Sequence, residues 1–332
     1  MKSDFYIRGW AESSGIRLSD DKIIEMLNNA PGLLSQCTGE FYIRWNNCSA
    51  RDHFGIIPGP SPPGTIVCDG KKSASIDPKL PPVEVGRAIE TAVALRRDEG
   101  IVALSGGVDS ALIAALAGRE CVSVGLEGSH DLRRARLVAD ELGLPLECVT
   151  VREEDIKEAL RQVLRVIPRK TPVDASIATT LYFVAEWAGE HGYERILAGC
   201  GADELFGGYA RYLKSENLEE ELKTDFKGLQ IQSKRDQSVA ALHNTYFSMP
   251  YMDIRVVRAA QAIPACDKVG EGIRKRPLRE VAKRHIPHEV AYYEKKAMQY
   301  GSGIWKAIQR LSRQNGYKKS VQGYLSQFNR VK

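Results

Sequence analysis

The spacing of hydrophobic and polar positions changes along the chain. In the first part, large apolar residues alternate with other residues over 40–45, and residues 65–68 form a second short apolar run, as is typical of strands. Residues 83–98 instead place apolar side chains at helical spacing. Later apolar runs predict buried strands at 101–104, 121–126, 147–151 and 194–198, with helices predicted at 111–117, 131–142, 156–166 and 177–190.

Strands that alternate with helices predict an α/β fold, a doubly wound parallel sheet with helices on both faces. Before this region, the proline-rich residues 58–63 and the prolines at 78, 81 and 82 interrupt regular structure. A chain of 332 residues is long enough for about two domains. We therefore expect a small β-rich domain over 1–78 and the α/β domain over 79–332.

The composition limits the classes of protein and partner. A net charge of +5 suits an anionic substrate but is too weak to favour nucleic acid. The seven cysteines are odd in number and include no C-x-x-C pair, which predicts neither a disulfide framework nor a zinc site. A signal sequence and a run of about 20 apolar residues are also missing. We expect a cytoplasmic protein with reduced thiols and no membrane partner.

The most informative motif lies between the predicted strand at 101–104 and the next helix. Leu104 is followed by Ser105, Gly106, Gly107, Val108, Asp109 and Ser110. The glycines let backbone N–H groups and a helix N-terminus approach a phosphate. The carboxylate of Asp109 beside that phosphate indicates a bridging Mg²⁺. The alternative is an ordinary glycine-rich turn, and the loop lacks the terminal Lys-Ser/Thr of a Walker P-loop.

A second glycine-rich motif follows the predicted strand at 194–198. It contains Gly199, Cys200, Gly201, Asp203 and Glu204, and it ends in Gly207-Gly208-Tyr209. Because ligands of a doubly wound sheet bind at the carboxyl ends of the strands, Asp109 and Asp203 are expected on one rim. Two carboxylates there repel each other unless a cation such as Mg²⁺ joins them. The alternative is that Asp203 and Glu204 only cap a helix.

These motifs together resemble a known family. Residues 105–110 are similar to the pyrophosphate loop of ATP pyrophosphatases (PP-loop enzymes), and residues 201–209 are similar to the synthetase domain of the asparagine synthetase family. Further similar segments follow in the family's order at 124–132, 235–236, 249–253, 275–279, 286–287 and 294–303. The resemblance covers about residues 82–304.

The resemblance implies acyl-adenylate chemistry. A carboxylate attacks the α-phosphorus of ATP, pyrophosphate leaves, and ammonia or an amine then displaces AMP. The family's ATP site corresponds here to Leu104, Ser105, Gly106, Gly107, Asp109, Ser110, Gly125, Leu126 and Gly199, with Asp109 and Asp203 as Mg²⁺ ligands. In the basic loop, Lys295 aligns with a catalytic lysine and Lys296 is the second candidate. The alternative for both lysines is a solvated basic face.

The first departure from the family pattern concerns the N-terminal domain. Glutamine-hydrolysing members begin with a cysteine directly after the initial methionine, whereas position 2 is lysine here and the first cysteine is Cys37. Residues 39–41 and 50–56 still resemble glutaminase segments. We therefore expect a truncated, catalytically inactive remnant of a glutaminase-like domain. Nitrogen would come from ammonia, an amine or a separate glutaminase subunit.

The second departure is Cys200. The family has a glutamate at this position, where a general base is expected, and β-lactam-forming relatives have a tyrosine there. A protonated thiol is a poorer general base than a carboxylate. Cys200 is therefore either a changed catalytic residue or a small packing residue, and the identity of the carboxylate substrate stays open.

The sequence thus predicts an AMP-forming carbon–nitrogen ligase similar to asparagine synthetase, which uses ATP and Mg²⁺ on a small carboxylate. One alternative is an RNA-modifying ATP pyrophosphatase of the thiolation type, although the sequence lacks a C-x-x-C pair. Another is a non-catalytic ATP-binding regulatory protein. The oligomeric state is left open, with a homodimer as one option.

Overall fold

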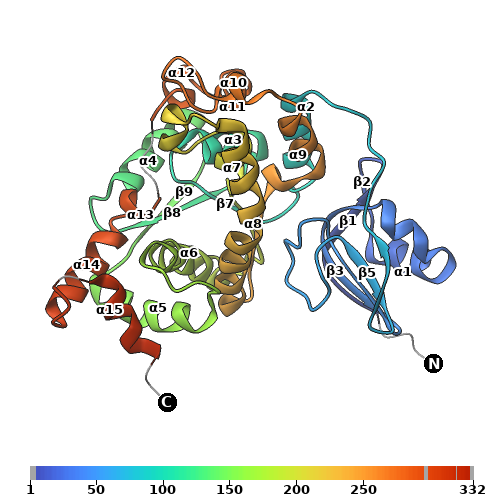
Figure 1. Ribbon diagram of the computed structural model, residues 1–332, viewed down its shortest axis with the longest axis horizontal. Coiled ribbons are helices and arrows are strands. Elements are labelled where there is room, and N and C mark those ends of the chain that lie inside the picture. The colour runs from blue at the N-terminus through green and yellow to red at the C-terminus, as the bar shows by residue number, and fades with distance from the viewer. Residues whose placement is uncertain (1–4, 295–297, 319, 330–332) are drawn as a thin grey trace. The chain divides into compact units, whose positions relative to one another are not determined.

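The computed structural model describes residues 5–294, 298–318 and 320–329. The chain folds into two compact units, and Figure 1 shows their helices and strands. The first unit comprises Met1–Asp98, Cys200–Gln230 and Ser248–Pro277, and the second comprises Glu99–Gly199, Ile231–Phe247 and Leu278–Lys332. The first unit thus contains all of residues 1–78 together with three further stretches, and the domain boundary expected near residue 78 stays a prediction.

An antiparallel sheet forms the N-terminal part of the first unit. Its strand order is β2-β1-β3-β4-β5-β6. The bounds are β1 Tyr6–Ser13, β2 Ile16–Arg17, β3 Thr38–Trp45, β4 Cys48–Arg51, β5 Thr65–Cys68 and β6 Lys71–Ser75. Strands β3 and β5 confirm the strands predicted at 40–45 and 65–68.

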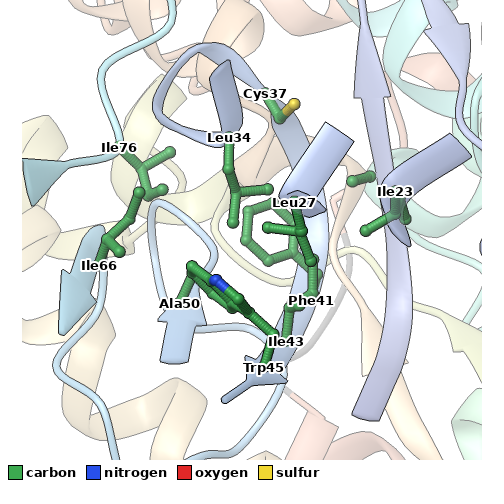
Figure 2. Close-up of a cluster of buried hydrophobic side chains, with 11 residues drawn as sticks. Ile23, Leu27, Leu34, Cys37, Phe41, Ile43, Trp45, Ala50, Ile66 and Ile76 are labelled. Carbon is green, nitrogen blue, oxygen red and sulfur yellow. The ribbon is translucent and has the colours of Figure 1, made fainter. Parts of the chain in front are cut away.

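One face of this sheet is covered by α1 (Asp20–Asn29) and the 3₁₀ helix η1 (Pro31–Gln36). Helix α1 begins after Ser19, whose side chain accepts a hydrogen bond from the Lys22 N–H. Figure 2 shows the resulting core, in which apolar side chains of α1 and η1 pack against the strands. Its labelled members are Ile23, Leu27, Leu34, Cys37, Phe41, Ile43, Trp45, Ala50, Ile66 and Ile76.

A disulfide joins Cys48 and Cys68 within this sheet. The two residues lie directly opposite each other in the β4–β5 pair. The expectation that all thiols are reduced was therefore wrong for this pair. Cysteine spacing could not reveal the bond, because the two residues meet only through the register of the strands. The remaining cysteines are not disulfide-bonded: Cys37, Cys121, Cys148, Cys200 and Cys266.

Short helices complete the first unit. They are α2 (Val85–Ala94), α7 (Ala202–Phe206), η2 (Ala210–Lys214), η4 (Pro250–Met252), α9 (Ile254–Gln261) and α10 (Ala265–Lys268), together with the first part of α8 (Leu218–Ala240). Helix α2 confirms the amphipathic helix predicted within 83–98, and it buries Ile89 and Val93. It packs against α9, so two segments far apart in the sequence share one core.

The second unit contains the predicted parallel sheet. Its order is β11-β10-β7-β8-β9, and β10, β7, β8 and β9 pair in parallel. The strands are β7 Ile101–Ala103, β8 Cys121–Gly125, β9 Leu146–Thr150, β10 Arg195–Leu197 and β11 Tyr246–Ser248. The crossover helices are α3 Val108–Ala117, α4 His130–Leu142, α5 Glu153–Val166 and α6 Pro172–Glu190. These elements confirm the α/β class.

The strand order explains where the helices lie. The chain steps from β7 to β8 and β9 in one direction, and it then returns to β10 on the other side of β7. Because such crossovers are right-handed, α4 and α6 cover opposite faces, as Figure 1 shows. Successive strands are added on one side of β7 and then, from β10, on its other side. The carboxyl ends of β7 and β10 are therefore the topological switch point, where doubly wound sheets bind ligands.

Of the remaining elements, η3 precedes β11 and the others follow it. They are η3 Ala241–His243, α11 Arg276–Ala282, α12 His288–Ala291, α13 Met298–Gly301, α14 Ile304–Gln314, α15 Val321–Ser326 and η5 Gln327–Asn329. Within the described part of the chain, we find no helix with the length and apolar character needed to cross a membrane.

Candidate functional site

The loop between β7 and α3 is closed by its own two serines. The Ser105 N–H donates to Ser110 Oγ at 3.1 Å, and the two hydroxyl oxygens lie 3.0 Å apart. Ser110 Oγ also donates to the Gly107 carbonyl oxygen at 3.2 Å. Leu104 continues the strand by donating its N–H to the Val122 carbonyl oxygen at 2.9 Å. Hydrogen bonds between the loop's own residues thus hold it in shape, which suits a binding site.

Gly106 occupies a position that only glycine fits. Its φ of +74° lies in the left-handed region, and a Cβ atom there would lie 2.6 Å from Arg134 Cγ. Gly107 is the N-cap residue of α3, and no side chain accepts a hydrogen bond from the first N–H groups of the helix there. The N-terminal N–H groups of this ten-residue helix carry partial positive charge. This end of α3 is suited to an anion, and Asp109 in its first turn is suited to a cation beside that anion.

Gly199, from the second motif, lies against the first turn of α3. A Cβ atom built on Gly199 would lie 3.0 Å from Asp109 Cβ and 3.4 Å from the Ser110 nitrogen. This approach follows from the parallel pairing of β10 with β7, because both strands end at the same edge. The structure therefore brings Asp109, Ser110 and Gly199 together at the switch point, as the sequence predicted.

Gly125 and Leu126 follow the neighbouring strand, β8. A Cβ atom on Gly125 would lie 2.4 Å from Oγ of Ser129, whose side chain caps α4. The Leu126 N–H donates to the Ser302 carbonyl oxygen at 2.9 Å. Ser302 is the centre of the Gly-Ser-Gly sequence at 301–303, so the end of the predicted basic loop contacts the segment after β8. Lys295 and Lys296 themselves lie outside the described residues.

Asp203 belongs to the first unit, where it forms an ion pair that the sequence did not predict. Lys275 Nζ lies 2.6 Å from Asp203 Oδ1, and the lysine is buried. Gly208 packs on this pair so closely that a Cβ atom would lie 1.7 Å from Asp203 Oδ1. Lys275 belongs to the Lys-x-x-Leu-Arg segment similar to the family, which was the available signal for it. The pair holds the Asp203 carboxylate in a defined place.

The predicted Mg²⁺ ligands have suitable chemistry. Magnesium is usually held by one or two carboxylates together with the phosphates of its substrate. Asp109 and Asp203 supply carboxylates, and they belong to different units, so their joint use stays a prediction. Across the residues that the structure describes, we find no group of three or more His, Cys, Asp or Glu side chains arranged to hold a metal by itself.

The segments that resemble a glutaminase have structural contacts in the first unit. Glu40 is fully buried and accepts hydrogen bonds from Arg96 Nε at 2.9 Å, Ser248 Oγ at 2.6 Å and the Met249 N–H at 2.9 Å. Trp10 donates its indole N–H to the same carboxylate at 3.3 Å. This carboxylate connects β3 to segments more than 50 residues away in the sequence.

Asp52 has a similar role inside the N-terminal sheet. Its carboxylate accepts backbone N–H groups of Ile56 at 2.9 Å, Ile57 at 3.0 Å, Phe54 at 3.2 Å and Phe41 at 3.3 Å. These bonds fix the turn that follows β4. Like Glu40, Asp52 therefore supports the fold of the domain.

Comparison with known proteins gives a consistent assignment. The asparagine synthase family profile matches residues 84–248 and 224–326. A Methanocaldococcus jannaschii protein named "Putative asparagine synthetase 1 (glutamine-hydrolyzing)" is 32% identical over 292 residues, which are 74% of this chain and 54% of that protein. Asparagine synthetase B (glutamine-hydrolyzing) of Escherichia coli K12 is 27% identical over 227 residues, 61% of this chain and 41% of its own length.

The chain thus spans about half the length of the curated relatives that it matches. The profile match covers the second unit almost completely and includes both glycine-rich motifs. Since it extends over well more than half of the chain, the assignment does not depend on the motifs alone. This chain belongs to the asparagine synthase family.

Proposed function

We propose that this chain is an ATP-dependent, AMP-forming carbon–nitrogen ligase. It would bind ATP at the switch point of the parallel sheet, adenylate a small carboxylate, and transfer the acyl group of that adenylate to ammonia or an amine. The observation that carries the proposal is the contact of Gly199 with the first turn of α3, next to Asp109 and the serine-closed loop. This arrangement combines a helix end suited to an anion with a carboxylate, in a loop that its own hydrogen bonds hold in shape.

The reaction has two steps, and pyrophosphate is the first leaving group. A substrate carboxylate oxygen forms a bond to the α-phosphorus as the bond to the bridging oxygen of pyrophosphate breaks. A nitrogen nucleophile then forms a bond to the acyl carbon, loses a proton, and releases AMP. The chain's task is to position two anions against each other and to neutralise the charge that develops.

Residues of the two glycine-rich motifs, of the segment after β8 and of the basic loop are proposed to serve these steps. The backbone N–H groups at 105–110 would hold the pyrophosphate part of ATP, and Gly125 and Leu126 would contact the nucleoside. Asp109 and Asp203 are each proposed as Mg²⁺ ligands, and the ion would neutralise the leaving pyrophosphate. Lys295, with Lys296 as the second candidate, is proposed to donate to the phosphate or to the tetrahedral intermediate.

We propose that this chain has no glutaminase activity of its own. Glu40 and Asp52, which lie in the glutaminase-like segments, have buried structural contacts that leave their carboxylates engaged with the fold. Nitrogen would then come from ammonia, an amine substrate or a separate glutaminase subunit. Cys200 takes the place of the family's glutamate, so the carboxylate substrate can differ from aspartate.

The test measures AMP and pyrophosphate release from Mg-ATP by the purified chain. Aspartate and a panel of other small carboxylates are supplied with ammonium, with an amine, or with glutamine. We expect continuous release with one carboxylate and ammonium or an amine. With glutamine as the nitrogen source we expect no release beyond a single turnover, because the adenylate then meets no nucleophile. Release that depends on glutamine would contradict the proposed absence of glutaminase activity. Tight Mg-ATP binding without turnover on any carboxylate would favour a regulatory protein.

A matched pair of variants tests the site itself. Asp109→Asn removes the proposed ligand charge, and we expect its rate of pyrophosphate release to fall by about 100-fold or more. Asp140→Asn makes the same carboxylate-to-amide change at an exposed position of α4 and is expected to leave the rate of pyrophosphate release unchanged. Equal rates for the two variants would exclude Asp109 from the reaction.

A further inference from the structure

Two side chains of α4 contact Tyr293. Arg134 Cζ lies 3.8 Å from the centre of the Tyr293 ring, a cation–π contact. One helical turn earlier, His130 Nε2 lies 2.8 Å from the Tyr293 hydroxyl oxygen. All three residues belong to the second unit. The ring of Tyr293 is therefore fixed on its face and at its hydroxyl group.

The backbone around Tyr293 is also held. Arg279 of α11 donates to the Ala291 carbonyl oxygen at 2.6 Å, and its other terminal nitrogen lies 2.7 Å from Glu294 Oε1. Arg279 is buried, so its bond to the Ala291 carbonyl oxygen is protected from water, whereas the Glu294 side chain is about half exposed. The segment that ends at Glu294 is thus anchored on both sides of Tyr293.

Arg134 connects this anchored segment to the phosphate loop. The position of a Cβ atom on Gly106 lies 2.6 Å from Arg134 Cγ and 2.9 Å from its carbonyl carbon, so the loop backbone packs directly on this residue. Arg134 Nη2 donates to the Glu289 carbonyl oxygen at 3.3 Å. Its buried Nε has no hydrogen-bond partner among the described residues. Stacking on Tyr293 is therefore a main contact that orients the guanidinium.

We propose that Arg134 and Tyr293 are positioning residues for the phosphate loop, which they hold in its left-handed conformation at Gly106. This inference rests on the proposed function, because that function makes the loop the pyrophosphate site. Loop N–H groups that shift by about an ångström lose much of their effect on a transition state. Nothing in the sequence marks Arg134, since its importance comes from contacts made by residues 28 and 159 positions away.

The test is a double-mutant cycle on pyrophosphate release. We expect Arg134→Ala and Tyr293→Leu each to lower kcat by about tenfold or more, while the Kd for Mg-ATP changes by less than about threefold. The double variant is expected to fall no further than the stronger single variant, because both changes break one contact. Tyr293→Phe keeps the ring and is expected to stay within about threefold of the unchanged protein. Arg136→Ala, exposed on the same helix, is the matched control and should match the unchanged protein.

A second measurement keeps the inference separate from the proposed function. Hydrogen–deuterium exchange of the peptide over 104–110, without substrate, is expected to accelerate in Arg134→Ala and in Tyr293→Leu but not in Arg136→Ala. Unchanged exchange, or additive effects on kcat, would overturn the positioning role. If the unchanged protein released no pyrophosphate with any carboxylate, the exchange result alone would decide the role. Arg134→Lys, which keeps the charge and Cγ but not the planar group, serves as the test if Arg134→Ala fails to fold.

Discussion

Glu40 and Arg96 stand 56 residues apart in the sequence and form a buried ion pair of 2.9 Å. The same guanidinium lies 3.1 Å from Asp253 Oδ2, and its Cζ is 4.9 Å from the centre of the Trp10 ring. Arg96 follows the end of α2, and Asp253 caps α9. The pair therefore connects β3 of the N-terminal sheet to two helices within the first unit, through charges that water does not reach.

Glu40→Ala is expected to destabilise the first unit strongly. The substitution removes the acceptor of four hydrogen bonds and leaves Arg96 buried with fewer partners, and breaking a buried pair costs about 3–5 kcal/mol. The measurement is the urea midpoint of unfolding. Glu25→Ala, exposed on α1, is the control and is expected to change the unfolding free energy by less than about 0.5 kcal/mol. Similar midpoints for the two variants would show that the pair does not stabilise the fold.

Gly208→Ala is expected to inactivate the protein through Asp203. The added methyl group would overlap the Asp203 carboxylate and the Lys275 side chain, so one of the two must move. If Asp203 takes part in the reaction, AMP formation should fall by about 100-fold or more. Gly228→Ala is the matched control, because its Cβ would meet nothing within 4 Å in α8. That variant should keep full activity, and equal losses in both variants would contradict the prediction.

Lys268 is expected to make stability depend on pH in the alkaline range. Burial lowers the pKa of its ammonium group to about 8, whereas the unfolded chain has a lysine pKa of about 10.4. Between these values the unfolded state binds a proton that the folded state does not, so the free energy of unfolding rises with pH. Lys268→Met should raise the urea midpoint at pH 7.5. Between pH 8 and pH 10 the midpoint of the variant should also increase less with pH than that of the unchanged protein. If the urea midpoint increased equally with pH in both proteins, groups other than Lys268 would cause the pH dependence.

The disulfide predicts a count of reactive thiols. Alkylation of the unfolded, unreduced chain should label five cysteines, and prior reduction should add Cys48 and Cys68. The bond closes a loop with a sequence separation of 20, so its loss should cost about 3 kcal/mol on the chain-entropy estimate. The difference in unfolding free energy between Cys48→Ser and the unchanged protein, obtained from their urea unfolding curves, measures that cost. Seven labelled thiols without reductant would show that the bond does not form in solution.

Local patterns predicted the parallel sheet and its switch point well. The apolar run at 121–126 became β8, and the glycines after β7 and β10 lie where the strands end. These features depend on residues within one element and its turn, so periodicity and glycine placement contain the information.

Long-range polar contacts were not predictable in this way. Glu40 with Arg96, Asp203 with Lys275 and Arg134 with Tyr293 each join residues whose separation exceeds 50 positions. A charged residue in a sequence is ordinarily read as solvent-exposed, and only the tertiary fold decides which charges become buried and paired. The Cys48–Cys68 bond likewise depends on strand register.

The contacts of Glu40 have a consequence for synthesis of the chain on the ribosome. Ser248, one of its hydrogen-bond donors, follows it by 208 residues. At about 5–20 residues per second, the nascent sheet must wait on the order of tens of seconds for that partner to emerge. During this interval the Glu40 carboxylate lacks its Ser248 and Met249 donors, and the surface that they will cover stays open to chaperones. The N-terminal sheet can thus form early, but it completes its contacts only late in synthesis.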